Sequence, residues 1–226
     1  MALKILLVFA TPSEAEIMKL IPGLINDRNR YNFRGSEIEV IITGIGGIST
    51  AWSMKQWLCN NAYPDLAINA GIAGSYNDIF KKGDVVVPVS DCFADLAIED
   101  GKKFLTLAEA GLTDPDRFPF EKGFIRADNR YVRESARILR TVRAITVNTA
   151  SGTKSTIDRL KIKFNPDIET MEGATFFYIC SMEKVPFLGI RAISNRVGPR
   201  NLKSWDIPHA LINLAAEINN LLNILT

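Results

Sequence analysis

Short apolar runs alternate with amphipathic segments along most of the chain. Residues 3–10 (LKILLVFA), 37–44 (EIEVIITG) and 65–71 (DLAINAG) have the length and composition of buried strands, and small or polar residues follow each of them. Apolar residues at helical spacing follow the first two runs, over 11–21 and from about 50 to 60, and Ser13 or Thr11 can cap the first helix. Strands that alternate with helices predict a largely parallel sheet covered on both faces.

The alternation continues to the last residues. Residues 83–98 (GDVVVPVSDCFADLAI) predict one or two strands, with Pro88 at an edge or a bulge. Residues 99–126 have no clear period and are interpreted as a loop-rich excursion. The remaining expected elements are a helix at 129–140, a strand at 143–151, a helix at 154–164, a turn and buried helix within 168–184, a strand at 187–195 and a helix at 205–222. We therefore expect one α/β domain over residues 1–226, a three-layer α/β/α fold with a central mixed, largely parallel twisted sheet.

Composition and charge narrow the classes of partner. The 226 residues are 47% hydrophobic, as a packed core requires, and 27 Lys and Arg are interleaved with 25 Asp and Glu. No segment offers the basic stripe of a nucleic-acid-binding surface. The apolar start of the chain is too short for a signal-peptide core with a cleavage site, and no run approaches the roughly 20 apolar residues of a membrane span. We expect a cytoplasmic protein that binds neither nucleic acid nor membrane.

The scarcity of histidine and cysteine excludes several chemistries. His209 is the single histidine and lies in a helical pattern, while Cys59, Cys92 and Cys180 are widely spaced. This distribution predicts no metal site and no disulfide framework, and each cysteine is expected to be a small buried side chain. GIGGIS lacks the third glycine of a dinucleotide fingerprint because Ser49 occupies that position. No cofactor is expected.

Candidate functional residues gather where the predicted strands end. Ligands of open parallel α/β sheets bind outside the carboxyl ends of the strands. The segments at these ends are Glu14, 44–47 (GIGG), 71–74 (GIAG), 151–153 (SGT), 171–173 (MEG) and Asn195. Taken singly, each glycine suits a tight turn. Their recurrence at successive strand ends favours a cleft in which the backbone approaches a ligand closely.

The ordered set of motifs resembles a known family. ATPSEAE, TGIGG, NAGIAGS, GDVVV, ETMEGATF and IRAISN occur in the order found in the purine nucleoside phosphorylase and nucleosidase superfamily, from Ala10 to Asn195. Within it, MEGATFFYIC and IRAISNRVGPRNLKSW are most similar to the futalosine hydrolases, which release hypoxanthine from futalosine on a route to menaquinone. The methylthioadenosine/adenosylhomocysteine nucleosidases are similar in general pattern.

The resemblance implies roles for two glutamates. Glu14 matches the glutamate that activates water, Glu172 the one that holds the ribose hydroxyls, and Met171 the methionine that packs under the sugar. Such a site suits cleavage through an oxocarbenium-like sugar, which needs negative charge nearby. The alternatives are that Glu14 is a solvated first-turn carboxylate and that Glu172 caps the helix that follows it.

Asn195 bears on which base is released. By resemblance, adenine-specific nucleosidases have an aspartic acid here that protonates the purine N7. An asparagine cannot act as that acid, but its amide can donate to N7 and to a 6-oxo group. We therefore expect a 6-oxopurine, and the alternative is a turn-forming asparagine.

Other positions are assigned to substrate binding by the same resemblance. They are Ile45, Ala73, Gly74, the loop residues Gly152, Ser155 and Thr156, and the arginines Arg196 and Arg200. The loop departs from the Ser-Gly-Asp-aromatic pattern of the nucleosidases, so no residue is assigned to stack on the base. The arginines suit the carboxylated tail of futalosine, and a plain charged loop is the alternative.

Hydrolysis competes with phosphorolysis and with simple binding. A phosphate site generally needs arginines beside backbone donors. None lies between Arg34 and Arg117, where the resemblance places the phosphate-binding arginines of the family, and Glu14 would repel phosphate. We expect an N-ribosyl hydrolase acting on futalosine. The alternatives are a methylthioadenosine/adenosylhomocysteine nucleosidase, a purine nucleoside phosphorylase and a non-catalytic nucleoside-binding protein. The resemblance also implies a homo-oligomer, with a dimer favoured and partner residues closing the tail site.

Overall fold

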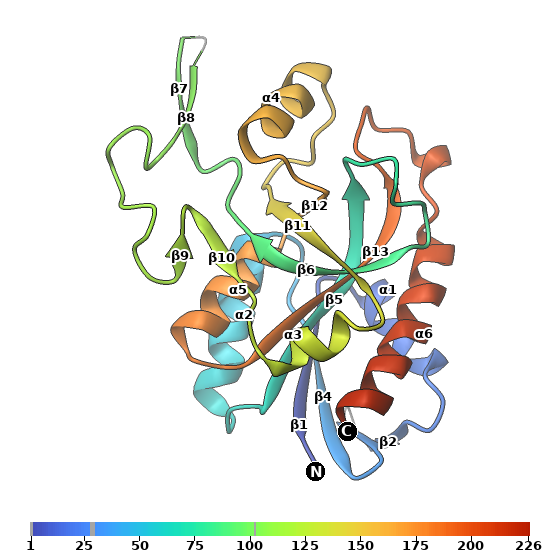
Figure 1. Ribbon diagram of the computed structural model, residues 1–226. Coiled ribbons are helices and arrows are strands. Elements are labelled where there is room, and N and C mark those ends of the chain that lie inside the picture. Colours follow the sequence, from blue (N-terminus) through green and yellow to red (C-terminus); the bar gives the residue numbers. More distant parts are fainter. Residues whose placement is uncertain (1, 28–29, 102) are drawn as a thin grey trace.

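One large sheet organises the chain. The computed structural model describes residues 2–27, 30–101 and 103–226 (Figure 1). An 11-stranded sheet has the order β2-β3-β4-β1-β5-β12-β11-β6-β10-β9, and β13 pairs with both β5 and β6. Its strands are β1 (Lys4–Phe9), β2 (Ile25–Asp27), β3 (Arg30–Phe33), β4 (Ser36–Ile42), β5 (Leu66–Ser75), β6 (Val85–Asp91), β9 (Phe120–Glu121), β10 (Phe124–Arg126), β11 (Arg140–Thr146), β12 (Ile168–Thr170) and β13 (Phe187–Arg196).

The sheet is mixed, as predicted. Parallel pairs join β4 to β1, β1 to β5, β5 to β13, and β6 and β12 to β11. Antiparallel pairs join the shorter outer strands, namely β2 to β3, β3 to β4, β9 to β10 and β10 to β6. In addition, β12 is antiparallel to β5, and the first residues of β6 are antiparallel to β13. The parallel strands β1 and β13 are almost wholly buried, because helices cover a parallel sheet on both faces.

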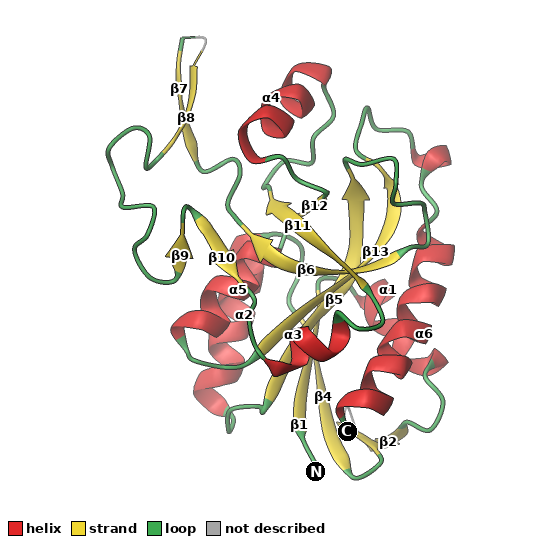
Figure 2. Cartoon of the chain, in the orientation of Figure 1, coloured by secondary structure: helices red, strands yellow, loops and turns green. Residues whose placement is uncertain are grey.

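Helices cover both faces of the sheet, as the α/β pattern predicts (Figure 2). Helices α2 and α5 pack together on one side, and α6 packs on β13, β5 and the short 3₁₀ helix that follows α1 on the other. The helices are α1 (Pro12–Ala15), α2 (Gly47–Asn60), α3 (Arg130–Ser135), α4 (Lys154–Phe164), α5 (Gly173–Met182) and α6 (Ile207–Leu225), with 3₁₀ helices at Glu16–Leu20 and Leu202–Ser204. In the described residues, no helix combines the length and the hydropathy needed to cross a membrane.

Several elements differ from the sequence prediction. The helix expected over 11–21 is α-helical for one turn, continues as a 3₁₀ helix, and ends at the extended Ile21, which precedes a proline. Residues 168–170, expected as a turn, form β12. A separate hairpin of β7 (Ala97–Asp100) and β8 (Lys103–Thr106) begins just before the excursion over 99–126, extends into it, and projects from the body (Figure 1). The bulge expected at Pro88 is confirmed, because the β6–β11 register shifts directly after Pro88 pairs with Val142.

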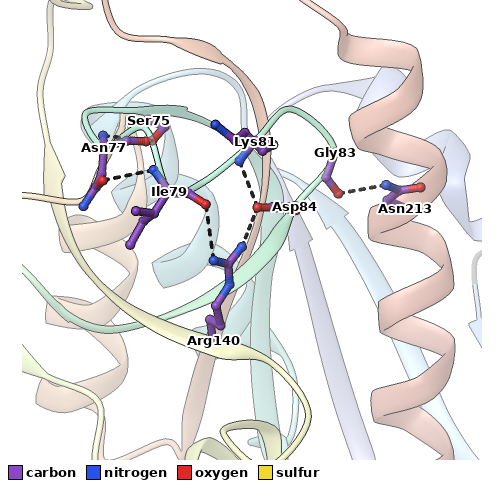
Figure 3. Close-up of polar contacts among 8 residues, drawn as sticks. All are labelled: Ser75, Asn77, Ile79, Lys81, Gly83, Asp84, Arg140 and Asn213. Atoms are coloured by element: carbon purple, nitrogen blue, oxygen red, sulfur yellow. Dashed lines mark hydrogen bonds and ion pairs between the residues drawn. The ribbon is translucent and has the colours of Figure 1, made fainter.

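The connection from β5 to β6 is fixed by local polar contacts (Figure 3). Arg140 donates to the carbonyl of Ile79 at 3.3 Å and to the carboxylate of Asp84. Gly83 has φ +85°, and a Cβ there would lie 2.5 Å from the ring of His209. The turn that leads into β6 therefore depends on Gly83 both for its backbone conformation and for its approach to α6. His209 lies on the first turn of α6, as expected of a helix residue.

Candidate active site

Loops and helix starts converge at the carboxyl ends of the parallel strands. Glu14 lies on α1 directly after β1, Gly46 precedes α2 after β4, and Gly71 and Gly74 lie near the end of β5. Glu172 precedes α5 and Asn195 lies at the end of β13. The fold thus brings residues from across the chain to one edge of the sheet.

Glu14 is buried, with 7% of its surface exposed. Its Oε2 accepts from the backbone N–H and the hydroxyl of Thr11, both at 3.0 Å, so it completes a capping box at the start of α1. Its Oε1 accepts from the backbone N–H of Ile72 at 3.1 Å. A Cβ at Gly71 would lie 2.6 Å from Oε1, which explains the glycine there. Glu14 is therefore a fixed, buried carboxylate and not a solvated one.

The Glu172 side chain contacts a segment that is distant in the sequence instead of capping its own helix. It occupies the N-cap position of α5 but makes no side-chain capping hydrogen bond. Its Oε1 accepts from the backbone N–H of Gly46 at 2.9 Å. Burial raises the pKa of Glu172, and the charge of Glu14 adds to the rise, while the Gly46 hydrogen bond and the charge of Arg191 lower it. The helix-cap alternative is wrong, and the GIGG turn donates to a carboxylate of the protein.

Arg191 is a buried cation that the sequence analysis did not single out. It lies on β13 with 3% of its surface exposed. Its Nη1 donates to the carbonyl of Asn69 at 2.6 Å, and its Nη2 donates to the Asn69 side chain. Burial lowers its pKa, and the charges of Glu172, Glu14 and Asp91 oppose that effect. The available sequence signal is a lone charge within the apolar run FLGIRAIS, because a buried charge needs partners.

Asp91 is a third carboxylate beside this cation and was also missed. It ends β6, is almost fully buried, and its Oδ1 accepts from the hydroxyl of Thr146 at 3.0 Å. Its Oδ2 has no hydrogen-bond partner among the residues that the structure describes, and it lies against Gly173, where a Cβ would be 2.2 Å away. Burial raises the pKa of Asp91 to about 7, against the Thr146 hydrogen bond and the charge of Arg191. The positive charge of Arg191 is thus stabilised by three carboxyl groups, those of Glu172, Glu14 and Asp91.

Asn195 lies at the same edge, directly across from Gly74 in the β5–β13 pairing. It is 8% exposed. Its Oδ1 accepts from the hydroxyl of Ser194 at 2.8 Å, and its Nδ2 donates to the carbonyl of Arg196 at 2.8 Å. The amide nitrogen carries a second hydrogen, which a ligand at this edge can accept.

The other predicted binding residues are placed less tightly. Met171 is half-buried next to Glu172, Ala73 is buried beside Gly74, and Ile45 is exposed next to Gly46. Ser155 and Thr156 lie in the first turn of α4, where the hydroxyl of Thr153 caps the backbone N–H of Thr156 at 3.2 Å, and Gly152 is exposed just before that cap. These contacts give the two hydroxyl residues a local capping environment.

The two arginines are exposed. Arg196 forms an ion pair with Asp78 at 2.7 Å, and Arg200 lies in the loop before the last 3₁₀ helix. This ion pair fits the charged-loop alternative for Arg196.

Two further observations concern possible metal ligands and the cysteines. Over the ranges that the structure describes, His, Cys, Asp and Glu side chains form no group of three that could hold a metal ion. Cys92 and Cys180 are buried as expected, whereas Cys59 is exposed, so that prediction is wrong for Cys59. It lies near the end of α2, one residue after the buried Leu58 and on a different face.

Comparisons with known proteins converge on one superfamily. A profile of the phosphorylase superfamily matches residues 19–226. A futalosine hydrolase of Thermus thermophilus is 27% identical over 192 residues, covering 84% of this chain and 83% of its own. A 5'-methylthioadenosine/S-adenosylhomocysteine nucleosidase of Buchnera aphidicola is 28% identical over 166 residues, covering 72% and 68%. The crystal structure of futalosine hydrolase from Helicobacter pylori shares the fold, with a TM-score of 0.78, 18% identity and 97% of each chain covered.

Proposed function

We propose that this chain, which belongs to the phosphorylase superfamily, hydrolyses the N-glycosidic bond of a purine nucleoside, with futalosine as the substrate. One observation carries the proposal: Glu14 and Glu172 are held at one edge of the sheet, near the buried cation of Arg191, by backbone N–H groups from two glycine-rich segments. Relatives named as futalosine hydrolases and as methylthioadenosine/adenosylhomocysteine nucleosidases both act on N-glycosyl bonds and support an enzyme of this class.

Glu14 and Glu172 each keep unused hydrogen-bond acceptor positions, and these suit different roles. A carboxylate offers about four acceptor positions, and Glu14 uses three of them on Thr11 and Ile72. The remaining position accepts a proton of the attacking water. Glu172 receives one hydrogen bond from Gly46 and keeps acceptor positions for the two ribose hydroxyls.

The reaction follows from these positions. The bond from C1′ to the purine breaks, the purine leaves with the electron pair as an anion that then takes up a proton from solvent water, and positive charge develops on the ribose, where Glu14 and Glu172 stabilise it. The water oxygen bonds to C1′ as its proton passes to Glu14. The second N–H hydrogen of Asn195 donates to the departing base, which favours a 6-oxopurine because its oxygen accepts hydrogen bonds.

Water is favoured over phosphate as the nucleophile. The backbone N–H of Gly46, a potential phosphate donor, is used by Glu172. Arg191 directs its terminal nitrogens to Asn69, in the interior of the sheet. Two carboxylates beside the sugar also repel an anion.

The protein acts as a homodimer in this proposal. Ile48 and Trp52 lie one turn apart on α2 and are 87% and 69% exposed, and Tyr178 and Met182 are similarly spaced on the adjoining α5 and are also exposed. Exposed apolar patches of this kind are typical of protein interfaces. A partner seated here would also cover Ile45, next to the turn that binds Glu172.

Substrate class is tested with purified wild-type protein. It is incubated with futalosine, aminodeoxyfutalosine, methylthioadenosine and inosine, with and without phosphate, and the released base is identified by chromatography. We expect phosphate-independent release of hypoxanthine, fastest from futalosine. Release that requires phosphate contradicts hydrolysis, and a preference for methylthioadenosine assigns the chain to the nucleosidases.

Glu14→Gln tests whether the chain is an enzyme with Glu14 as the base. We expect kcat to fall by about 10²–10⁴-fold, because the amide cannot take the proton of water. The Kd for the nucleoside, measured by calorimetry, should stay close to the wild-type value. Glu16→Gln, an exposed glutamate two residues away that pairs with Lys19, is the matched control and should retain full activity. Nucleoside binding without base release in the wild type would support a non-catalytic binding protein.

A further inference from the structure

A further buried carboxylate, Glu169, lies outside the set described above. It is on β12, is 7% exposed, and forms no ion pair among the residues that the structure describes. Its Oε1 accepts from the backbone N–H of Ser151 at 2.8 Å. Its Oε2 accepts from the hydroxyl of Ser151 at 2.5 Å and from the phenol of Tyr76 at 2.6 Å. Both oxygens are therefore occupied by groups of the protein.

The contacts of Glu169 join three separate segments. Tyr76 directly follows β5, Glu169 lies on β12, and Ser151 lies in the loop between β11 and α4. Tyr76 and Ser151 are also buried, and their hydroxyls are 3.2 Å apart. Burial, followed by the charge and hydrogen bond of Glu169, raises the pKa of the Tyr76 phenol, so Tyr76 stays protonated and remains a donor. We refer to Tyr76, Ser151 and Glu169 as the Glu169 clamp.

The clamp lies beside the proposed base-binding edge. Glu169 pairs with Gly74 in the antiparallel β12–β5 contact, and Asn195 pairs with the same Gly74 in the parallel β13–β5 contact. Glu169 on β12 and Asn195 on β13 thus lie on the two strands that pair with β5 at Gly74. The loop that Ser151 anchors leads into the N-cap of α4, above the ends of β11 and β12 (Figure 1).

Packing alone does not account for a glutamate here. The adjacent Ile168 is fully buried, and burying a carboxylate against neutral donors costs more than burying an apolar side chain. The Glu169 carboxylate instead fixes the position of the loop, because it accepts charge-assisted hydrogen bonds from a backbone N–H and two hydroxyls. The start of the same loop is held separately by Asp95, which accepts from the backbone N–H of Asn148 at 2.5 Å.

We propose that Glu169 is a positioning residue for base recognition, which holds the loop at residues 151–153 against the end of β5 so that it forms a rigid wall of the purine pocket beside Asn195. The proposal rests on the proposed function, which puts the purine at this edge. It assigns Glu169 no contact with the substrate. Its effect is to preorganise the pocket, so its loss should weaken the purine-dependent part of binding and catalysis.

Glu169→Gln is the principal test, with two substrates that separate base recognition from ribose chemistry. We expect kcat/KM for the nucleoside to fall about tenfold or more, and the Kd for free hypoxanthine to rise by a similar factor, as loss of one charge-assisted contact implies. Hydrolysis of p-nitrophenyl β-riboside, whose leaving group is not a purine, should change less than threefold or so, because Glu14 and Glu172 are untouched. Tyr76→Phe removes one donor to Glu169 and should give a smaller change in the same direction. It replaces Glu169→Gln as the test variant if Glu169→Gln does not fold.

The matched control is Asp167→Asn. Asp167 lies two residues before Glu169, and its side chain accepts from the backbone N–H of Arg143 at 2.9 Å. Its backbone carbonyl accepts from the N–H of Tyr76 at 2.8 Å, and the substitution leaves that carbonyl unchanged. This variant should keep wild-type values for both substrates. Equal losses on the nucleoside and the p-nitrophenyl riboside, or no loss on either, would overturn the role of Glu169 while leaving hydrolysis intact. A wild-type protein that binds hypoxanthine but cleaves no nucleoside refutes the proposed function alone, and one that does neither refutes both.

Discussion

Gly71 shows how a residue with no side chain contributes to this site. The carboxylate of Glu14 occupies the space that a Cβ at position 71 would fill. Gly71 and Ile72 therefore fix Glu14 together, one by leaving room and the other by donating its N–H. The segment 71–74 (GIAG), which suits a simple turn when only the sequence is considered, holds the proposed catalytic base in place.

Gly71→Ala should displace the Glu14 carboxylate and lower kcat about a hundredfold, since a shift of the base by about 1 Å has effects of that size. The base-release assay measures this. Gly198→Ala, where a Cβ meets nothing within 4 Å, is the control and should leave kcat unchanged. Retained kcat in Gly71→Ala would mean that Glu14 can shift without loss and is not the base.

The sequence located some site residues and missed others for a physical reason. Glu14 and Asn195 lie at the ends of predicted strands and Glu172 lies at the start of a predicted helix, where polar residues stand out. Arg191 and Asp91 lie within strands of apolar neighbours, and their importance depends on which strands are adjacent in the sheet. Strand order is a tertiary property, and a single chain does not reveal it. The Glu169 clamp was missed for the same reason, because its members come from three segments.

At the scale of elements, the start of α5 links the carboxylates. Thr146 donates to Asp91 and accepts from the backbone N–H of Ala174 at 2.7 Å, while Glu172 precedes the same helix. Asp91 is also packed against Gly173, the first residue of α5. The negative charge near this helix start is favoured by the helix dipole, but burial in the absence of a second hydrogen-bond partner opposes ionisation of Asp91.

Asp91→Asn should change how stability depends on pH. The pKa of Asp91 rises from 3.8 to about 7 on folding, so the folded chain keeps a proton that the unfolded chain releases between these values. The contribution of Asp91 to the free energy of unfolding therefore falls as pH rises from about 4 to 7, by up to about 4 kcal/mol. Urea denaturation from pH 4.5 to 8 should show a flatter profile for Asp91→Asn than for wild type. Asp128→Asn, at an exposed aspartate, should match wild type, and parallel profiles for Asp91→Asn would show that Asp91 is ionised throughout.

Elements were predictable where burial imposes a clear pattern. The strands at 3–10, 37–44 and 187–195 were identified because each contains a short run or alternation of large apolar residues. The β7–β8 hairpin was missed because none of its described residues is fully buried, and strands without a buried face lack the alternation of apolar and polar residues that marks a strand. The three-residue β12 is too short for a period of its own, and its pairing with β5 and β11 makes it a strand.

At the scale of the whole molecule, the exposed apolar faces of α2 and α5 form the proposed dimer surface. The two helices pack against each other on one side of the sheet (Figure 2). Such a surface would leave apolar side chains in water in a monomer, and association would bury them.

Trp52→Glu should convert the dimer to a monomer, because association would bury an unpaired charge. Light scattering coupled to gel filtration gives the mass directly. Ile162→Glu on α4 introduces the same charge at a residue that is 87% exposed, and it should remain dimeric. A monomeric wild type, or dissociation by Ile162→Glu alone, would contradict the assignment of this surface.

The hydrogen bond from Gly46 to Glu172 joins residues that are 126 positions apart in the chain, and the contact of Arg191 with Asn69 spans 122. Contacts of such separation form late, since the intervening chain must first lose most of its conformational freedom. On the ribosome, the first contact has to wait until Glu172 has emerged, and the second until β13 has emerged. Base release is consequently a stringent reporter of complete folding: a chain interrupted before β13 can build β1, β4 and β5, yet it cannot hold the two glutamates and Arg191 in one place.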